Sequence, residues 1–131
     1  MVQKITFDLV SPERLLLSQA VDMVTIPGSE GYMGVAAGHM PLVSTLRAGM
    51  INMLDNGTET RFFIMGGFAE INASQVIVLA EEALPMSELD LAVLDQRIKD
   101  AQDDEIAAKT DADRVKAALR VDDLKLVRAV F

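Results

Sequence analysis

The 131-residue chain contains no cysteine, no tryptophan and a single histidine. The absence of cysteine excludes disulfides, thiolate nucleophiles and cysteine-based zinc sites, and it fits a reducing compartment. With one histidine, any metal site would consist almost entirely of carboxylates. The acidic residues form no convincing cluster of that kind, so we expect no metal and no cofactor.

Long apolar runs and positive charge are also scarce. No run approaches the roughly 20 residues of a membrane-spanning helix, and residues 1–10 alternate like a strand rather than follow the plan of a signal peptide. The 12 Lys and Arg against 20 Asp and Glu give a net charge of −8, with no basic stripe for nucleic acid. We therefore expect a soluble, cytoplasmic protein that binds no nucleic acid and reaches a membrane only through a partner.

The chain changes character near residue 86. All eight glycines lie at or before Gly67 and all four prolines at or before Pro85, whereas the remaining residues are dense in charge. Glycine and proline are typical of turn-rich β structure, and charged sequence without glycine is typical of exposed helices. The sequence therefore predicts a β domain over residues 1–85 and a helical domain over residues 86–131.

The first half reads as short strands separated by turns. Ile5, Phe7 and Leu9 alternate with polar residues and share one face of a strand. Two hairpins follow, one turning at residues 55–57 (Asp-Asn-Gly) and one near residues 72–74 (Asn-Ala-Ser). Many short strands without intervening helices indicate an antiparallel sandwich or barrel.

The second half reads as a hairpin of two helices. Ser87, three residues before Asp90, resembles a capping box after the break at Pro85. The first helix carries an apolar stripe of Leu91, Leu94, Ile98 and Ala101. A turn between about 104 and 111 precedes a second helix whose stripe begins with Ala112, Val115 and Leu119, then shifts to Val121, Leu124 and Val127. Two narrow stripes favour a hairpin that packs on itself and is able to move as a unit.

The stretch GSEGYMGVAAGHMPLV, residues 28–43, is the most distinctive in the chain. Histidine is the side chain most often used as a general base, but the neighbours of His39 supply no orienting acid and no nucleophile, so a structural or contact role is favoured. The glycines lack the spacing of a phosphate loop and fit tight turns instead. The apolar residues form either an exposed partner-facing rim or ordinary core, and the sequence leaves both open: Met33, Val35, Met40, Leu42 and Val43.

Three blocks resemble, in order and spacing, the epsilon subunit of bacterial F-type ATP synthases. They are FDLVSPERLLLS (7–18), IPGSEGYMGVAAGHMPLVSTLRAGMI (26–51) and MGGFAEINASQVIVLAEEA (65–83), with a looser match at ALRVDDL (118–124). The resemblance implies a mainly β plus α fold: an N-terminal antiparallel β-sandwich of about ten strands, followed by a C-terminal two-helix hairpin. It also implies a non-catalytic central-stalk subunit that joins the gamma subunit to the c-ring and couples proton flow to ATP synthesis. Such a subunit lies peripherally at the cytoplasmic face of the bacterial inner membrane.

The resemblance also implies roles for individual residues. A c-ring-facing loop would contain Glu30, Gly31, Tyr32, Met33, His39, Met40 and Leu42. Contacts with gamma would involve Ser11, Ser44 and Met50. Tyr32 stands where the family pattern often has an acidic residue, which favours a flatter and more apolar contact with the c-ring.

The hairpin departs from the family members that bind ATP. Their I/L-D-x-x-R-A motif is represented here by Leu89 and Asp90, but Val93 replaces the arginine. Without that guanidinium we expect no nucleotide binding. The hairpin also looks shorter than in family members whose helices reach far up gamma, and its aspartate runs lower its net basicity. We therefore expect only weak restraint of ATP hydrolysis through hairpin contacts with the alpha and beta subunits. Two alternatives remain: a free-standing regulatory module whose hairpin binds a nucleotide or a partner helix, and a small enzyme using His39 with a carboxylate such as Glu30.

Overall fold

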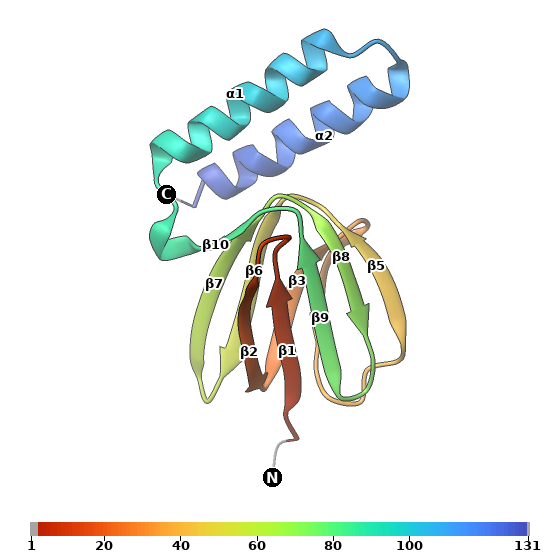
Figure 1. The fold of residues 1–131 in the computed structure, drawn as a ribbon, viewed down its shortest axis with the longest axis vertical. Helices are drawn as coiled ribbons and strands as arrows, with labels where there is room; N and C mark the ends of the chain where they lie inside the picture. Colours follow the sequence, from red (N-terminus) through yellow and green to blue (C-terminus); the bar gives the residue numbers. More distant parts are fainter. Residues whose placement is uncertain (1–2, 131) are drawn as a thin grey trace. The chain divides into compact units, whose positions relative to one another are not determined.

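The computed structural model describes residues 3–130 and divides into two compact units, Met1–Met86 and Ser87–Phe131. The first unit is one ten-stranded sheet that curls on itself (Figure 1), with β4 paired to β3 beside the path β10-β7-β6-β3-β5-β8-β9-β1-β2. Its strands are β1 Ile5–Val10, β2 Leu15–Val21, β3 Met23–Gly28, β4 Gly31–Val35, β5 Leu42–Leu46, β6 Gly49–Asp55, β7 Thr58–Ile64, β8 Gly67–Ile71, β9 Gln75–Ala80 and β10 Ala83–Pro85. The predicted fold class, a ten-stranded sandwich followed by two helices, is confirmed.

One strand pair departs from the expected antiparallel pattern. β1 and β9 run parallel, with Phe7 opposite Val76 and Leu9 opposite Val78. Hairpin turns impose antiparallel pairing only on strands that follow one another closely. β1 and β9 are brought together by the closing of the sheet, so no turn sets their relative direction.

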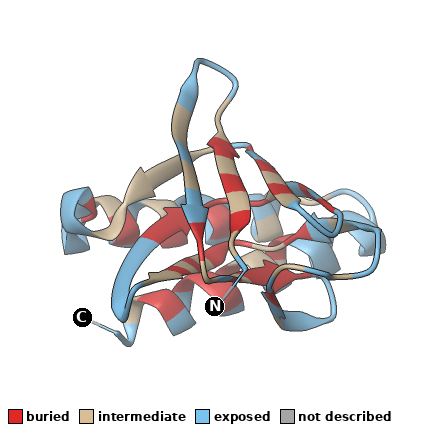
Figure 2. Cartoon of the chain, turned by 90° about the horizontal axis from the view of Figure 1, so that it is seen from below, coloured by how far each residue is buried: buried red, intermediate tan, exposed pale blue. Residues whose placement is uncertain are grey.

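The core of the sandwich follows from the alternation of apolar residues along its strands. Ile5, Phe7 and Leu9 are completely buried, as predicted, and red and lighter segments alternate along the strands in Figure 2. Phe7 meets Phe62 edge to face, with ring centroids 6.5 Å apart. The inner faces of the two sides of the curled sheet therefore form one apolar core.

Both predicted hairpin turns are present. Asn56 and Gly57 join β6 to β7 with φ angles of 51° and 78°, so both central residues adopt the left-handed conformation that matches strand twist in a two-residue loop. Between β8 and β9, the Asn72 side-chain oxygen accepts the backbone N–H groups of Ser74 and Gln75, both at 2.9 Å. This Asx arrangement replaces the strand hydrogen bonds lost at the bend.

A short 3₁₀ turn, Met86–Glu88, spans the boundary between the units, and the second unit contains two helices, α1 Leu91–Ala107 and α2 Asp111–Arg128. The expectation that Ser87 caps the first helix is wrong, because the 3₁₀ turn intervenes and Asp90 is the cap, accepting the Val93 N–H at 2.8 Å. Thr110 caps α2 by accepting the Asp113 N–H at 3.1 Å. Each cap satisfies an amide that has no partner inside its helix.

The apolar faces of the helices match the prediction only in part. Leu94, Ile98 and Ala101 of α1 are buried. The predicted stripe at the start of α2 is wrong, because Val115 and Leu119 are 60% and 46% exposed. The buried apolar face of α2 is Ala117, Val121, Leu124 and Val127. This face continues the spacing of the later stripe back by one turn, and residues 115 and 119 lie on the opposite side of the helix.

Candidate partner-binding surfaces

The turn between β3 and β4 and the adjacent strand β5 enclose a cavity of about 590 Å³. Five of the seven residues predicted to face the c-ring line this cavity, and His39 and Met40 do not. Glu30 is the only charged residue in the lining, beside hydroxyl groups from both sides. The complete lining is Gly28, Ser29, Glu30, Gly31, Tyr32, Met33, Leu42, Val43, Ser44 and Thr45.

His39 and Met40 lie in the loop between β4 and β5. The Gly38 N–H donates to the Ala73 carbonyl at 2.7 Å, which ties this loop to the β8–β9 turn. His39 Nδ1 lies 2.7 Å from the Met40 carbonyl oxygen, so this nitrogen carries a proton and is no free base. Because His39 does not line the cavity that contains Glu30, the structure does not favour the acid–base alternative.

The structure divides the predicted apolar rim into two groups. Val35 is completely buried and belongs to the core. Met40 and Val43 are 79% and 70% exposed, and Leu42 is exposed to a smaller extent. Tyr32 in β4 is also 58% exposed. The parts of the stretch that remain available to a partner are therefore the β3–β4 turn with Tyr32 and the loop before β5 with the start of β5.

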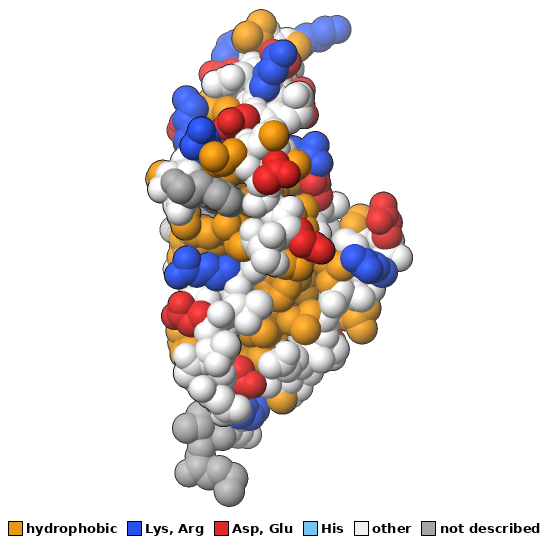
Figure 3. Space-filling view, turned by 90° about the vertical axis from the view of Figure 1, so that its left-hand side faces the viewer, with side chains coloured by type: hydrophobic (Ala, Val, Ile, Leu, Met, Phe, Trp, Pro, Cys, Tyr) orange, Lys and Arg blue, Asp and Glu red, His pale blue; other side chains and the backbone are white. Residues whose placement is uncertain are grey.

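A second surface lies on the outer face of the sheet. Thr45, Phe68, Leu79, Val10 and Leu15 stand side by side on five neighbouring strands. We call these five residues the outer row. Phe68 and Leu79 are 55% and 51% exposed. On the side of the molecule that lies at the left of Figure 1, hydrophobic side chains also reach the surface of the sandwich unit (Figure 3). Large exposed apolar groups in contact with one another are typical of a protein-binding surface.

Phe68 and Leu79 were not among the predicted site residues. Strand alternation could have identified them. Their neighbours Ala69 and Val78 are buried, so residues 68 and 79 point outward. A groove of about 440 Å³ runs along this part of the outer row and contains Ser11, a predicted gamma contact. Its lining is Val10, Ser11, Pro12, Gly67, Phe68, Leu79, Ala80 and Glu81.

The other two predicted gamma contacts lie elsewhere in the sandwich unit. Ser44 is opposite the buried Ala69 and lines the cavity. Met50 is half-buried on β6, where its backbone N–H donates to the Tyr32 hydroxyl oxygen at 3.2 Å. The three residues therefore do not form a single patch.

A charged cluster joins the beginning of β1 to the β6–β7 turn. Lys4 Nζ contacts Asp55, lies 2.9 Å from Asp22 Oδ1 and donates to Asn56 Oδ1 at 3.1 Å. Hydrogen bonds from Lys4 and from the Asn56 N–H lower the pKa of the Asp22 carboxyl, and the bonds to Asp55 and Asp22 raise the pKa of Lys4. These carboxylates bind an internal ammonium group, and residues 3–130 contain no group of side chains suited to a metal ion.

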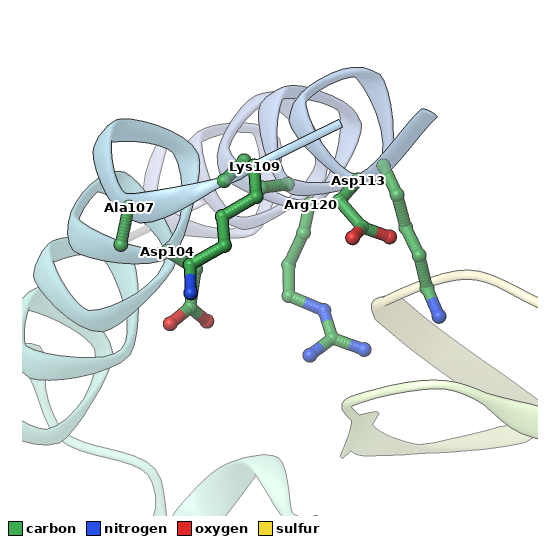
Figure 4. A pocket seen from close by; sticks show the side chains of 8 residues that line it. Asp104, Ala107, Lys109, Asp113 and Arg120 are labelled. Atoms are coloured by element: carbon green, nitrogen blue, oxygen red, sulfur yellow. The ribbon is translucent and has the colours of Figure 1, made fainter. Parts of the chain in front are cut away.

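At the α1–α2 turn, a hollow of about 460 Å³ is lined by charges of both signs. Figure 4 shows the side chains of Asp104, Lys109, Asp113 and Arg120 on one side of the helices. The lining is Asp104, Ala107, Ala108, Lys109, Asp113, Lys116, Ala117 and Arg120. Because carboxylates stand among the cations, this hollow is not organised for a phosphate group.

Comparisons with known proteins agree with this architecture. The family model described as "ATP synthase, Delta/Epsilon chain, beta-sandwich domain" matches residues 4–86. The ATP synthase epsilon chain of Parvibaculum lavamentivorans is 50% identical over 129 residues, which cover 98% of each chain. The chain belongs to the ATP synthase epsilon-chain family. The epsilon chain of Maricaulis maris is 45% identical over 99% of this chain and 98% of its own.

Two solved structures resemble the epsilon-family chain over nearly its whole length. One chain belongs to the Euglena gracilis mitochondrial ATP synthase (OSCP/F1/c-ring, rotational state 1), with a TM-score of 0.77, 27% identity and coverage of 97% of this chain and 81% of that chain. The other is in the central stalk/c-ring of Tetrahymena thermophila mitochondrial ATP synthase, with a TM-score of 0.74 and 18% identity over 98% and 96%. The second likeness concerns the fold alone.

Family membership settles the question of catalysis. The epsilon-family chain is a non-catalytic part of ATP synthase. No helix within residues 3–130 is long and apolar enough to cross a membrane.

Proposed function

We propose that this chain joins the gamma subunit to the c-ring in the central stalk of an F-type ATP synthase, at the cytoplasmic face of a bacterial inner membrane. In this role it couples rotation driven by proton flow to ATP synthesis. Support comes from its bacterial epsilon-chain relatives and from its likeness to a chain of an assembled F1/c-ring.

The outer row is the observation that carries the proposal, and we assign it to gamma. Phe68 and Leu79 lie directly opposite each other on β8 and β9 and keep about half of their surface exposed. Exposed aromatic residues such as Phe68 are enriched in the cores of protein interfaces. The groove beside them contains Ser11. We retain Ser44 and Met50 as further gamma contacts, on parts of the sandwich unit outside the outer row.

We assign the cavity and the loop before β5 to the c-ring. The assigned residues are Glu30, Gly31, Tyr32, Met33, His39, Met40 and Leu42. Met40 is 79% exposed, and Glu30 gives the cavity a negative charge. Both proposed surfaces belong to one curled sheet with a fully apolar core. Because such a core is close-packed, it resists deformation and suits the transmission of torque.

A complementation experiment tests the assignment to gamma. ATP synthase lacking its epsilon chain is reconstituted in vesicles, this chain is added, and ATP-driven proton pumping is recorded. The wild-type chain should restore pumping, and Phe68→Ser should need a concentration at least about tenfold higher, because a central apolar anchor is lost. The control is Leu119→Ser on α2, which likewise replaces an exposed apolar side chain by serine. Equal restoration by Phe68→Ser and the wild type would refute the assignment.

We propose residues 86–131 as a separate helical domain that reaches alpha and beta subunits but restrains ATP hydrolysis only weakly. Residues 86–131 contain 8 Lys and Arg against 11 Asp and Glu, including the aspartate runs 103–104 and 122–123, so the hairpin offers little positive charge for electrostatic contact with those subunits. Titrating the chain into the catalytic head while recording ATP hydrolysis tests this. Inhibition by more than half at saturation would contradict it.

A further inference from the structure

The sheet divides at β3. The β3–β6 ladder ends where Thr25 pairs with Asn52, and β3 then pairs with β5 at Gly28 and Leu46. Continuing the first register would place Pro27 opposite Met50. Pro27 has no N–H, and its carbonyl already accepts the Arg47 N–H at 2.9 Å. The Met50 N–H therefore finds no acceptor on β3, and its partner has to be a side chain or water.

Tyr32 supplies that acceptor. It lies on β4 directly opposite Pro27, and its hydroxyl oxygen accepts the Met50 N–H at 3.2 Å. The side chain thus reaches from β4 past β3 to β6. Gly49 leaves space for it, because a Cβ at this position would lie 2.7 Å from the phenolic oxygen and 3.1 Å from the Pro27 Cβ.

We propose that Tyr32 is a positioning residue whose hydroxyl ties the β3–β4 hairpin to β6 and holds the cavity in the shape that its partner binds. The identity of that partner rests on the proposed function; the tie itself does not. The turn of this hairpin forms one wall of the cavity, and residues 42–45 form the other. Fixing the wall before docking lowers the entropy lost on binding. Tyr32 also lines the cavity, where it adds no charge, and its hydroxyl holds the hairpin in place through the Met50 N–H.

Hydrogen exchange in the full chain tests the tie. In Tyr32→Phe the ring remains and only the acceptor oxygen is removed, so the Met50 amide should exchange about fivefold faster, the change expected for one net hydrogen bond. The control is Thr60→Val, which removes an exposed hydroxyl from β7. Unchanged exchange at Met50 in Tyr32→Phe would overturn the proposal.

Gly49→Ala provides a second, independent test of the geometry. Its Cβ would displace the phenolic oxygen, so this variant should also speed exchange at Met50 by about fivefold. Combined with Tyr32→Phe it should add little, because the bond is already lost. If the two increases in exchange rate multiplied in the double variant, the methyl group and the hydroxyl would be acting on different contacts. That result would contradict the proposal.

Docking separates a positioning role from a merely structural one. From c-ring-containing membranes, Tyr32→Phe should dissociate about three- to tenfold faster than the wild type, while its binding to the isolated catalytic head stays unchanged. Faster exchange with an unchanged dissociation rate would overturn the positioning role. If the wild type binds neither preparation, the proposed function fails, and exchange at Met50 still decides whether the tie exists.

Discussion

The α-carbon of Gly67 lies so close to β9 that a Cβ at this position would stand 2.0 Å from the carbonyl oxygen of Leu79. Gly67 also has a φ angle of +141°, which side chains rarely adopt. In the same β8–β9 ladder, the next residue, Phe68, lies opposite Leu79 in the outer row.

Gly67→Ala should lower the free energy of unfolding by more than about 2 kcal/mol, because the backbone of two paired strands has to move. Urea denaturation measures the change. The matched control is Gly34→Ala, whose Cβ would meet only the Met23 side chain at 3.5–3.6 Å, and which should change stability by less than about 1 kcal/mol. Equal costs for the two substitutions would contradict this account of the β8–β9 contact.

The cluster around Lys4 should make stability depend on pH in a defined direction. The lowered pKa of the Asp22 carboxyl means that its contribution is present above the unfolded-state pKa of about 4 and is lost as the pH falls through the lower folded-state value. Asp22→Asn should therefore be less stable than the wild type at neutral pH, with a difference that shrinks in acid. Thermal unfolding between pH 2 and 7 measures it. Asp122→Asn on α2 is the control, and a difference independent of pH would refute the link.

Asp95 of α1 and Arg128 of α2 form an ion pair, with Nε 2.7 Å from Oδ1. Because their side chains are 52% and 43% exposed, the pair should contribute only about 0.2–1 kcal/mol and be weakened by salt. A double-mutant cycle with Asp95→Asn and Arg128→Gln measures this coupling. A coupling well above that range, or one insensitive to salt, would show that the pair is less accessible to solvent than the structure indicates.

The hairpin should not bind ATP. Asp90 uses its carboxylate to cap α1, and Val93 offers no guanidinium to a phosphate. Calorimetric titration with ATP should therefore give no saturable heat at millimolar concentration. Asp90→Ala should lower helix stability by about 1 kcal/mol through loss of the cap and leave the ATP titration unchanged. Saturable heat with the wild type would contradict the account.

Much of the fold was predictable from local chemistry. Asn56-Gly57 specifies a two-residue hairpin loop, and the alternation at Ile5, Phe7 and Leu9 specifies an inward face; both are present in the structure. The stripe on α2 was mispredicted because Val115 and Leu119 satisfy helical spacing as well as Ala117 and Val121 do. Spacing identifies an apolar face, but packing decides which of two faces is buried.

The candidate surfaces were less predictable, because they depend on contacts between distant segments. The sequence places Tyr32 and Met50 in the same block, 18 residues apart, with no sign that they share a hydrogen bond. The parallel pairing of β1 and β9 is equally hidden, and with it the alignment of Val10 beside Leu79 in the outer row. Such relationships come from closure of the sheet rather than from any one strand.

As a stalk subunit, this chain should bind the rest of the complex through its sandwich unit. The most direct test adds the purified chain to its cognate catalytic head lacking epsilon and measures binding stoichiometry together with ATP hydrolysis. We expect one chain bound per head, little inhibition of ATP hydrolysis, and weaker binding of Phe68→Ser. Failure of the wild-type chain to bind at micromolar concentration would contradict it.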